Sequence, residues 1–356
     1  MEILKTYRKI EYDLPPEKIA LYPADPRDLC RLMVIHMPDM IIEDRHFTDI
    51  TDYFNAGDVI AVNNSRVIPA RLHGRKQTGG NVEFLLLEQD DAGWKAMGRP
   101  AARMKKDTVI EVVSPSGKKT SVKIKKKCTG GIFFLETPGN ILDYGYMPLP
   151  PYIVSRRKVS NGDKKDYQTN FAECDGSVAS PTSALHFTDR TIRALAEKGV
   201  VIAPVTLHVG PGTFKAHYDK PDPEKYSLSI ESAERLNESD RICVCGTTVM
   251  RTLESVYDGV KYNHGSGETG LFITPGHTFS RIKMFLTNFH LHTTPLIQLV
   301  AAFIEKFYPG CGPEKTVELY RYAIENNYRF LSYGDAMLII DDNEQVSEKK
   351  REGRGG

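Results

Sequence analysis

The sequence predicts an α/β (α+β) fold in which a discontinuous α/β domain carries a small antiparallel β-barrel domain as an insertion. Two observations support this prediction. Short segments of strand character, separated by glycine and proline turns, fill residues 72–146, as is typical of a small barrel or sandwich. After the proline-rich stretch 147–151, the pattern changes to alternating helices and strands, which indicates an α/β domain.

The length of the chain favours two domains. Its 356 residues exceed what one hydrophobic core usually supports. We expect residues 1–71 and 147–342 to form the α/β domain and residues 72–146 to form the barrel. The last segment, residues 343–356, is charged and glycine-rich, so we expect a disordered tail there.

Individual elements follow from local patterns. Within the inserted region, the expected strands are residues 81–88, 108–113, 120–126 and 131–136. Beyond it, a helix begins at Thr188 and stops at Gly199. The further expected elements are strands at 200–208, 241–245 and 285–289 and helices at 230–236 and 296–307.

Composition predicts a soluble cytoplasmic protein. Hydrophobic residues make up 40% and charged residues 26% of the chain, and no apolar run approaches the roughly 18 residues of a membrane helix. The first residues lack the pattern of a signal peptide. The six cysteines are sparse, and Cys243 and Cys245 are interpreted as core residues of a strand, so no metal site and no membrane partner are expected.

A cluster of lysines in the inserted region stands out against a net charge of only +1. Alternation along the expected strand places Lys123 and Lys125 on its outer face, and Lys127 follows in the same basic run. Such a face could lie along an RNA phosphate backbone, or it could be an ordinary solvated strand.

Three histidines lie at junctions where an apolar strand or a loop meets a helix or a glycine-rich turn: His186, His208 and His290. Because the carboxyl ends of parallel strands share one edge of a sheet, these junctions indicate a common ligand site. A Gly-Thr-Thr turn at Gly246 has the same character. No Rossmann or P-loop motif is present, so these patterns alone do not name the ligand.

Ordered motifs along the chain carry a resemblance to a known family. They include Asn63-Asn-Ser-Arg-Val-Ile-Pro-Ala-Arg71, Met147-Pro-Leu-Pro-Pro-Tyr-Ile153, Pro181-Thr-Ser-Ala-Leu-His-Phe-Thr188, Gly246-Thr-Thr-Val-Met-Arg251 and Thr287-Asn-Phe-His-Leu291. In this order they resemble the S-adenosylmethionine:tRNA ribosyltransferase-isomerase family of queuosine biosynthesis, and the similarity extends to about Ile340.

The resemblance implies both a fold and a reaction. The fold is an α/β domain with an inserted barrel. The reaction transfers and isomerises the ribosyl unit of S-adenosylmethionine onto 7-aminomethyl-7-deazaguanine at the wobble position of tRNA, giving epoxyqueuosine-tRNA, adenine and methionine. S-adenosylmethionine is then a substrate rather than a permanently bound cofactor, and no metal is expected.

This chemistry requires a general acid and a general base. The candidates for these catalytic roles are His186, His208, His290, Asp335 and Glu254. The expected substrate-binding residues are Asn64, Arg66, Arg71, Gly210, Thr213, Gly246, Thr247, Thr248, Arg251, Asn288, Arg329 and Tyr333. For Arg66, Arg71 and Arg251, the carboxylate of methionine, an RNA phosphate and a structural ion pair remain as alternative partners.

One segment departs from the family pattern and keeps a second function open. Residues 215–226 are shorter than in most members. The alternative is a divergent paralogue that transfers a ribosyl or alkyl group from S-adenosylmethionine to a small-molecule acceptor. A tRNA-binding module without catalysis is a third possibility, disfavoured by the retained histidines. We expect a monomer.

Overall fold

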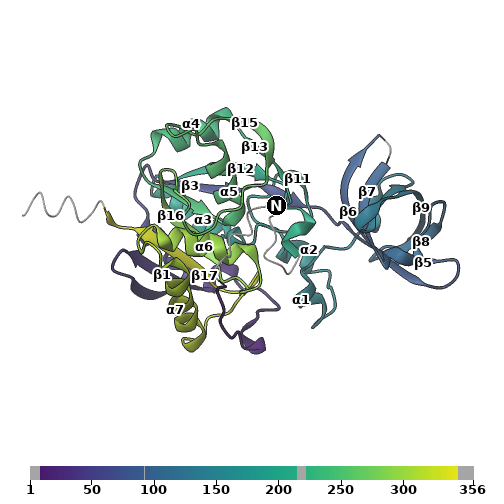
Figure 1. The fold of residues 1–356 in the computed structure, drawn as a ribbon, viewed down its shortest axis with the longest axis horizontal. Helices are drawn as coiled ribbons and strands as arrows, with labels where there is room; N and C mark the ends of the chain where they lie inside the picture. The colour runs from purple at the N-terminus through teal and green to yellow at the C-terminus, as the bar shows by residue number, and fades with distance from the viewer. Residues whose placement is uncertain (1–8, 92, 215–221, 344–356) are drawn as a thin grey trace, which may run out of the picture.

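The computed structural model describes residues 9–91, 93–214 and 222–343, with residues 213 and 214 described by their backbone alone. Within these ranges, a large sheet with helices on both faces lies at one end of the molecule and a separate small barrel at the other (Figure 1). The predicted fold class, an α/β domain with an inserted antiparallel barrel, is confirmed.

The described residues of the α/β domain form a nine-stranded sheet. In spatial order its strands are β15 (Gly265–Thr269), β13 (Glu224–Leu228), β12 (Val201–Leu207), β3 (Val59–Asn63), β14 (Ile242–Cys245), β16 (Ile282–Asn288), β17 (Ala336–Asp341), β1 (Arg31–Met37) and β2 (Ile41–His46). The four central strands β12, β3, β14 and β16 are parallel. Their carboxyl ends therefore meet at one edge, as the sequence predicted for β12, β14 and β16.

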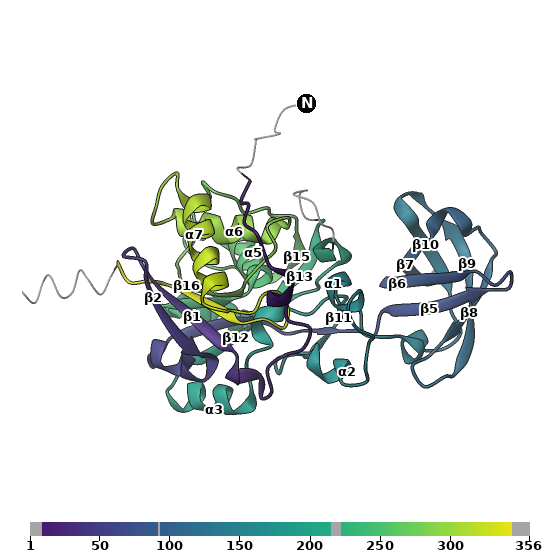
Figure 2. The ribbon, with the colours of Figure 1, turned by 90° about the horizontal axis from the view of Figure 1, so that it is seen from below.

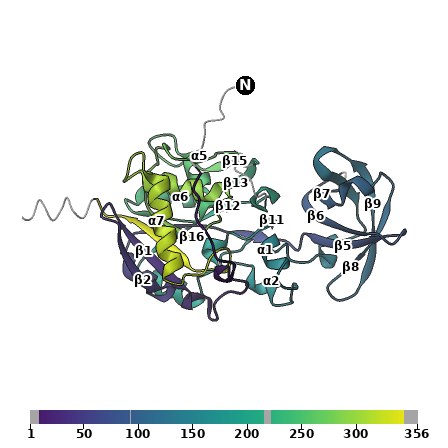
Figure 3. The same cartoon turned by 60° about the horizontal axis from the view of Figure 1, so that its bottom comes forward.

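Most of the helices cover one face of this sheet. They are α4 (Ile230–Glu238), α5 (Thr247–Val256), α6 (Pro295–Glu305) and α7 (Gly312–Glu325). The last two lie side by side (Figure 3). On the opposite face lie α3 (Asp189–Glu197) and the 3-10 helix η3 (Phe47–Tyr53). Thr188 caps α3 by accepting a hydrogen bond from the Thr191 N–H, which explains the predicted start of that helix.

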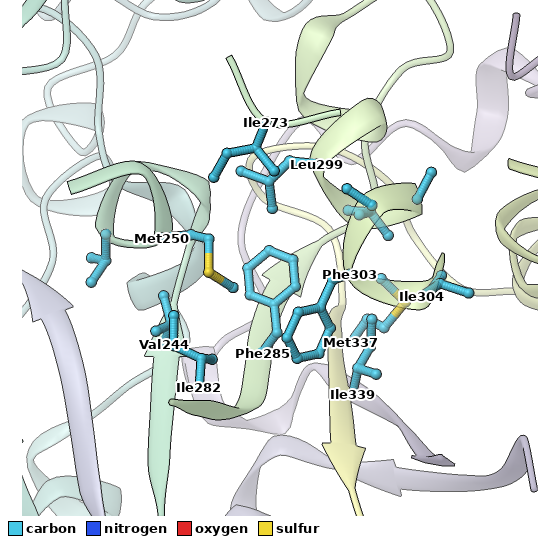
Figure 4. Close-up of a cluster of buried hydrophobic side chains, with 14 of the residues drawn as sticks. Val244, Met250, Ile273, Ile282, Phe285, Leu299, Phe303, Ile304, Met337 and Ile339 are labelled. Atoms are coloured by element: carbon cyan, nitrogen blue, oxygen red, sulfur yellow. The ribbon is translucent and has the colours of Figure 1, made fainter. Parts of the chain in front are cut away.

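Alternation along the strands builds a separate core on each face of the sheet. Met33 and Ile35 of β1 point toward the helices, whereas Leu32 and Val34 point toward the opposite core. Figure 4 shows the helix-side core, in which Phe285, Phe303 and Met250 lie among aliphatic side chains. Full burial of these apolar side chains holds α5 and α6 against the sheet.

The inserted barrel closes completely in the described structure. In spatial order its strands are β10 (Ile132–Glu136), β7 (Gly93–Arg99), β6 (Asn81–Asp90), β5 (Arg71–Lys76), β8 (Val109–Val113) and β9 (Lys119–Lys127). The sequence did not predict β7, whose two glycines weaken its strand signal. Gly98 is needed there, since a Cβ atom would lie 2.8 Å from the Phe133 ring.

Two chain segments connect the barrel to the α/β domain (Figure 2). Beside them, Arg71 and Tyr146 exchange both backbone hydrogen bonds. A small parallel pair of strands, β4 (Ser65–Val67) and β11 (Cys174–Ser177), and two short helices, α1 (Pro151–Val154) and α2 (Asp163–Asp166), lie on the α/β side of the junction. Lys225 of β13 also forms an ion pair with Glu88 of β6. Of the predicted tail, residues 343–356, only residue 343 is among the described residues.

Candidate active site

A cavity of about 260 Å³ opens at the carboxyl edge of the central strands. Its polar and ionisable lining residues are Tyr152, Tyr167, Ser180, Thr182, Ser183, Glu224, Thr247, Thr248, Arg251, Asn288, His290, Thr294 and Ser332. Prolines, Leu291, Leu296 and Leu331 supply apolar walls. A concave site with apolar walls and converging polar groups is typical of a small-molecule site.

The turn from β14 into α5 forms one wall of the cavity. Gly246 has a φ of +93°, and an added Cβ would lie 3.3 Å from the Ser183 hydroxyl. Only glycine meets both conditions without strain. Thr247 and Thr248 follow at the start of the ten-residue helix α5, and both line the cavity. The first N–H groups of a helix have no carbonyl partner within it, so this end favours ligand oxygens and negative charge.

A buried ion pair forms a second wall. Arg251 donates to a Glu224 carboxylate oxygen at 2.6 Å, and both side chains are 8% exposed. Arg251 also donates to the carbonyl oxygens of Leu271 and Thr269, and the second Glu224 oxygen accepts the Gly210 N–H at 2.8 Å. The predicted binding residue Gly210 therefore orients Glu224, and the charge of Arg251 is already balanced.

Asn288, at the end of β16, is hydrogen-bonded to two residues of the motif 181–188. Its Oδ1 accepts the Thr182 hydroxyl at 3.1 Å, and its Nδ2 donates to His186 Nε2 at 3.0 Å. His186 does not line the cavity; its other ring nitrogen contacts Cys30 Sγ at 3.2 Å. Burial lowers the His186 pKa to about 3, so the ring is neutral near pH 7 and can accept the hydrogen bond from the Asn288 amide.

His290 is the predicted histidine that does line the cavity. Its Nε2 lies 2.9 Å from the Thr287 hydroxyl, and its backbone N–H and carbonyl are hydrogen-bonded to the hydroxyls of Tyr320 and Tyr12. Burial lowers the His290 pKa to about 4. The ring is therefore neutral near pH 7 and is held in one place, as proton transfer requires.

His208 lies away from the cavity, although its neighbour Val209 lines it. The Nδ1 of His208 is 2.8 Å from the Ser65 hydroxyl, and burial lowers its pKa. Asn64 is similarly engaged outside the cavity, with Thr206 and Glu173. The strand-end pattern located these residues near the site but did not determine which way each side chain points.

The two predicted acidic catalytic residues are committed to structural contacts elsewhere. Glu254 accepts hydrogen bonds from Ser280 and lies 2.9 Å from His277 Nε2. Asp335 accepts the backbone N–H groups of Arg31 and Arg329 as well as the Arg329 guanidinium. The structure therefore does not bring Glu254, Asp335 or Arg329 to the cavity.

The remaining predicted binding residues lie near the barrel junction or outside the described side chains. Arg66 is exposed and donates to the Ala172 carbonyl, whereas Arg71 contacts Glu83 and the Leu149 carbonyl. Tyr333 is buried beside Tyr167 and does not line the cavity. The side chain of Thr213 is outside the described part of the chain.

Several cavity residues were missed by the sequence reasoning. Tyr152 donates its hydroxyl to Ser332 at 2.6 Å, and Tyr167 packs beside it in the junction. The Ser180 hydroxyl is buried and has no hydrogen-bond partner among the described residues. Glu224 comes from the antiparallel strand β13. Tyr152 stood within the family motif 147–153, which was the available signal.

The lysine run on β9 has the predicted outward orientation. Lys123, Lys125 and Lys127 are exposed, while Val122 and Ile124 are buried in the barrel. Lys123 pairs with Asp107 at 3.1 Å, and Lys127 donates to the Ala101 carbonyl at 2.8 Å. The barrel therefore presents a basic strand to solvent.

Two further properties concern only the described residues. Within the ranges 9–91, 93–214 and 222–343, no group of three or more His, Cys, Asp or Glu side chains is arranged to hold a metal ion. No helix in the same ranges is long and apolar enough to cross a membrane.

Fold and site together define an α/β protein with a small-molecule cavity at its sheet edge and an inserted barrel with a basic face. The model of the queuosine biosynthesis protein family matches residues 7–339. The chain belongs to this family, which confirms the resemblance carried by its motifs.

Relatives and a solved structure agree with this membership. Proteins named S-adenosylmethionine:tRNA ribosyltransferase-isomerase from Thermus thermophilus and Sulfurihydrogenibium are each 40% identical; the first alignment covers 96% of this chain and 100% of the relative, the second 93% and 98%. The crystal structure of S-adenosylmethionine tRNA ribosyltransferase from Thermotoga maritima matches with a TM-score of 0.54 at 33% identity, covering 93% of this chain and 100% of that one. The prediction of an enzyme of this family is confirmed.

Proposed function

We propose that this chain is an S-adenosylmethionine:tRNA ribosyltransferase-isomerase. It transfers and isomerises the ribosyl unit of S-adenosylmethionine onto 7-aminomethyl-7-deazaguanine at the tRNA wobble position and releases adenine and methionine. The observation that supports this proposal best is the coincidence of the family motifs with one cavity. Gly246, Thr247, Asn288 and His290 all belong to those motifs and all line it.

The cavity residues suit the two proton transfers that this reaction needs. A C–H bond next to the sulfonium must lose a proton, and adenine leaves more readily when it is protonated. His290 is the histidine in the cavity; its ring is neutral near pH 7 and can act as a base, and burial makes that base weaker than an ordinary histidine. The rings of Tyr152 and Tyr167 offer electron-rich faces to the sulfonium. Thr247 and Thr248, at the helix terminus, suit the methionine carboxylate.

The basic strand of the barrel suits the second substrate. Lys123, Lys125 and Lys127 project from an exposed strand of a separate domain, where they can follow RNA phosphates without entering the cavity. We propose that the barrel binds the tRNA while the α/β domain binds the donor.

The decisive experiment incubates the purified protein with S-adenosylmethionine and tRNA that bears the deazaguanine precursor, then digests the RNA for mass spectrometry. We expect the epoxyqueuosine nucleoside together with released adenine. His290→Phe should lose turnover by at least about 100-fold, the usual scale for a positioned acid or base. His264→Ala, a change at an exposed histidine that does not line the cavity, is the matched control.

The shortened segment at residues 215–226 keeps the small-molecule acceptor as a second candidate. Residues 215–221 of this segment lie outside the described structure, and Glu224 beyond them lines the cavity. Adenine release that does not depend on tRNA would favour this candidate. No adenine release under either condition would contradict ribosyl transfer to either acceptor.

A further inference from the structure

The side-chain amide of Asn288 is held at both ends by hydrogen bonds to neighbouring side chains. Thr182 Oγ1 donates to its Oδ1, and its Nδ2 donates to His186 Nε2. Since an amide nitrogen only donates, the Nε2 of His186 must carry a lone pair, and the ring proton must be on Nδ1, facing Cys30 Sγ. Asn288 and His186 are 1% and 4% exposed. The amide therefore cannot rotate without breaking two hydrogen bonds.

The fixed amide has further hydrogen-bonding capacity on its cavity side. A primary amide carries two N–H donors and two acceptor lone pairs, and the hydrogen bonds with Thr182 and His186 use one of each. One N–H and one lone pair of the planar amide remain on a residue that lines the cavity. A buried polar group with this capacity has a high cost if no partner occupies it.

We propose that Asn288 recognises the adenine ring of the donor through this donor–acceptor pair. The exocyclic amino group of adenine donates to Oδ1, and the adjacent ring nitrogen accepts the Nδ2 N–H. An asparagine amide is complementary to adenine in just this bidentate manner. The inference rests on the proposed function, because it takes S-adenosylmethionine to be the ligand, and it adds a specificity-determining residue to that site.

His186 and Thr182 act as positioning residues in this arrangement. They determine which end of the amide presents the acceptor, and hence which bases fit. A base that carries an oxo group in place of the amino group, such as hypoxanthine, would place two acceptors against each other. Burial holds His186 neutral, so it remains an acceptor for Asn288 throughout the physiological pH range.

The test measures binding of unreactive donor analogues to the full-length protein by calorimetry, without tRNA. The probes are S-adenosylhomocysteine, S-inosylhomocysteine and the 1-deaza and 7-deaza forms of S-adenosylhomocysteine. We expect S-inosylhomocysteine to bind at least about tenfold more weakly than S-adenosylhomocysteine, as for a missing buried hydrogen bond. One deaza analogue should weaken by a similar factor, which identifies the ring nitrogen. Equal affinity for all four probes would overturn the proposal.

Variants then link the discrimination to the amide. Asn288→Leu keeps the branched shape of the side chain and should bring the two affinities within about twofold, while Thr182→Val should reduce the discrimination in part. Asn161→Ala, at an exposed asparagine, should leave it unchanged. Retained discrimination in a folded Asn288→Leu protein would contradict the assignment. If that variant does not fold, the comparison of the four probes on the wild-type protein still tests the proposal.

The binding measurements can succeed or fail independently of the test for tRNA modification. Discrimination without tRNA modification would overturn the proposed reaction while supporting adenine recognition by Asn288. Modification of the tRNA without discrimination would support the reaction and overturn this inference. Absence of S-adenosylhomocysteine binding would overturn the inference itself.

Discussion

At the scale of single residues, Arg251 shows how the structure distinguishes between alternatives that a sequence leaves open. The sequence allowed either a ligand anion or a structural ion pair as its partner. In the structure its guanidinium already binds the Glu224 carboxylate and two backbone carbonyls. Because the pair is buried, its desolvation offsets much of its attraction, and its main effect is to hold β13 against α5 at the cavity wall.

This arrangement predicts an asymmetry between single and double substitutions. Arg251→Met leaves the Glu224 carboxylate buried without its partner, and we expect the free energy of unfolding to fall by about 3–5 kcal/mol. Replacing both residues, as Glu224→Leu with Arg251→Met, should restore most of this stability. Urea unfolding followed by circular dichroism measures both. A double variant as unstable as the single one would contradict the explanation.

The buried His186 predicts a dependence of stability on pH. Burial lowers its pKa in the folded protein to about 3, whereas an unfolded histidine has a pKa of about 6.5. The unfolded chain therefore takes up a proton first as the pH falls, so this contribution to stability is complete above pH 6.5 and is lost towards pH 3. Between pH 7 and pH 5 the decrease in stability from this residue is about 2 kcal/mol.

Two variants test whether His186 causes this pH dependence. His186→Gln should lower stability at both pH values but should show a smaller difference between pH 7 and pH 5 than the parent protein in urea unfolding. His264→Gln, at an exposed position, should keep the parent's difference. An unchanged difference in His186→Gln would show that another group carries the pH dependence.

Sequence reasoning found part of the site for an identifiable reason. Gly246, Asn288 and His290 follow parallel strands, and such strands end at one edge, so their convergence could be predicted. The direction of each side chain beyond the strand end could not, and His208 consequently lies outside the cavity. Glu224 could not be predicted either, because β13 joins the sheet antiparallel to β12.

At the scale of elements, Gly246 in the turn from β14 into α5 can be compared with Gly259, which lies beyond the end of α5. Gly246 and Gly259 both have positive φ angles, +93° and +98°. A Cβ at Gly246 would meet Ser183, whereas one at Gly259 would meet nothing within 4 Å. The φ angles are similar, whereas the space around the two positions differs.

We therefore expect Gly246→Ala to be more destabilising than Gly259→Ala. The control substitution should cost about 1–2 kcal/mol from backbone strain alone. Gly246→Ala should cost more and should also weaken S-adenosylhomocysteine binding, because it displaces the wall formed by Ser183 and Thr247. Thermal unfolding and calorimetry measure the two effects. Equal decreases in stability and unchanged affinity in both variants would contradict a role for close packing at this turn.

Element prediction succeeded where local signals were strong. The helix after Thr188 was predicted from its cap, and the strands at β12 and β14 from their continuous apolar runs. The strand β7 was missed, since its glycines conceal an alternation that appears only in its burial pattern. The strands β1 and β17 were also not predicted, although both carry apolar runs, so local signals identified only some of the elements.

At the scale of the whole molecule, the sheet order depends on contacts between distant parts of the chain. β3 lies between β12 and β14, although it precedes both by more than a hundred residues. β1 pairs with β17 near the other end of the chain. No local pattern encodes these pairings, so the predicted domain organisation did not extend to the strand order.

The separation of cavity and basic strand predicts that donor and tRNA binding can be altered independently. Replacing Lys123, Lys125 and Lys127 by Gln should weaken binding of the precursor tRNA and should lower the slope of log affinity against log salt by up to about 0.9 for each phosphate that a lysine no longer neutralises. S-adenosylhomocysteine affinity should not change, because none of the three lysines lines the cavity. The matched control replaces three exposed lysines of the α/β domain, Lys9, Lys198 and Lys261. Filter binding across a salt series distinguishes the variants: equal slopes for the two triple variants would show that this strand of the barrel does not contact the RNA.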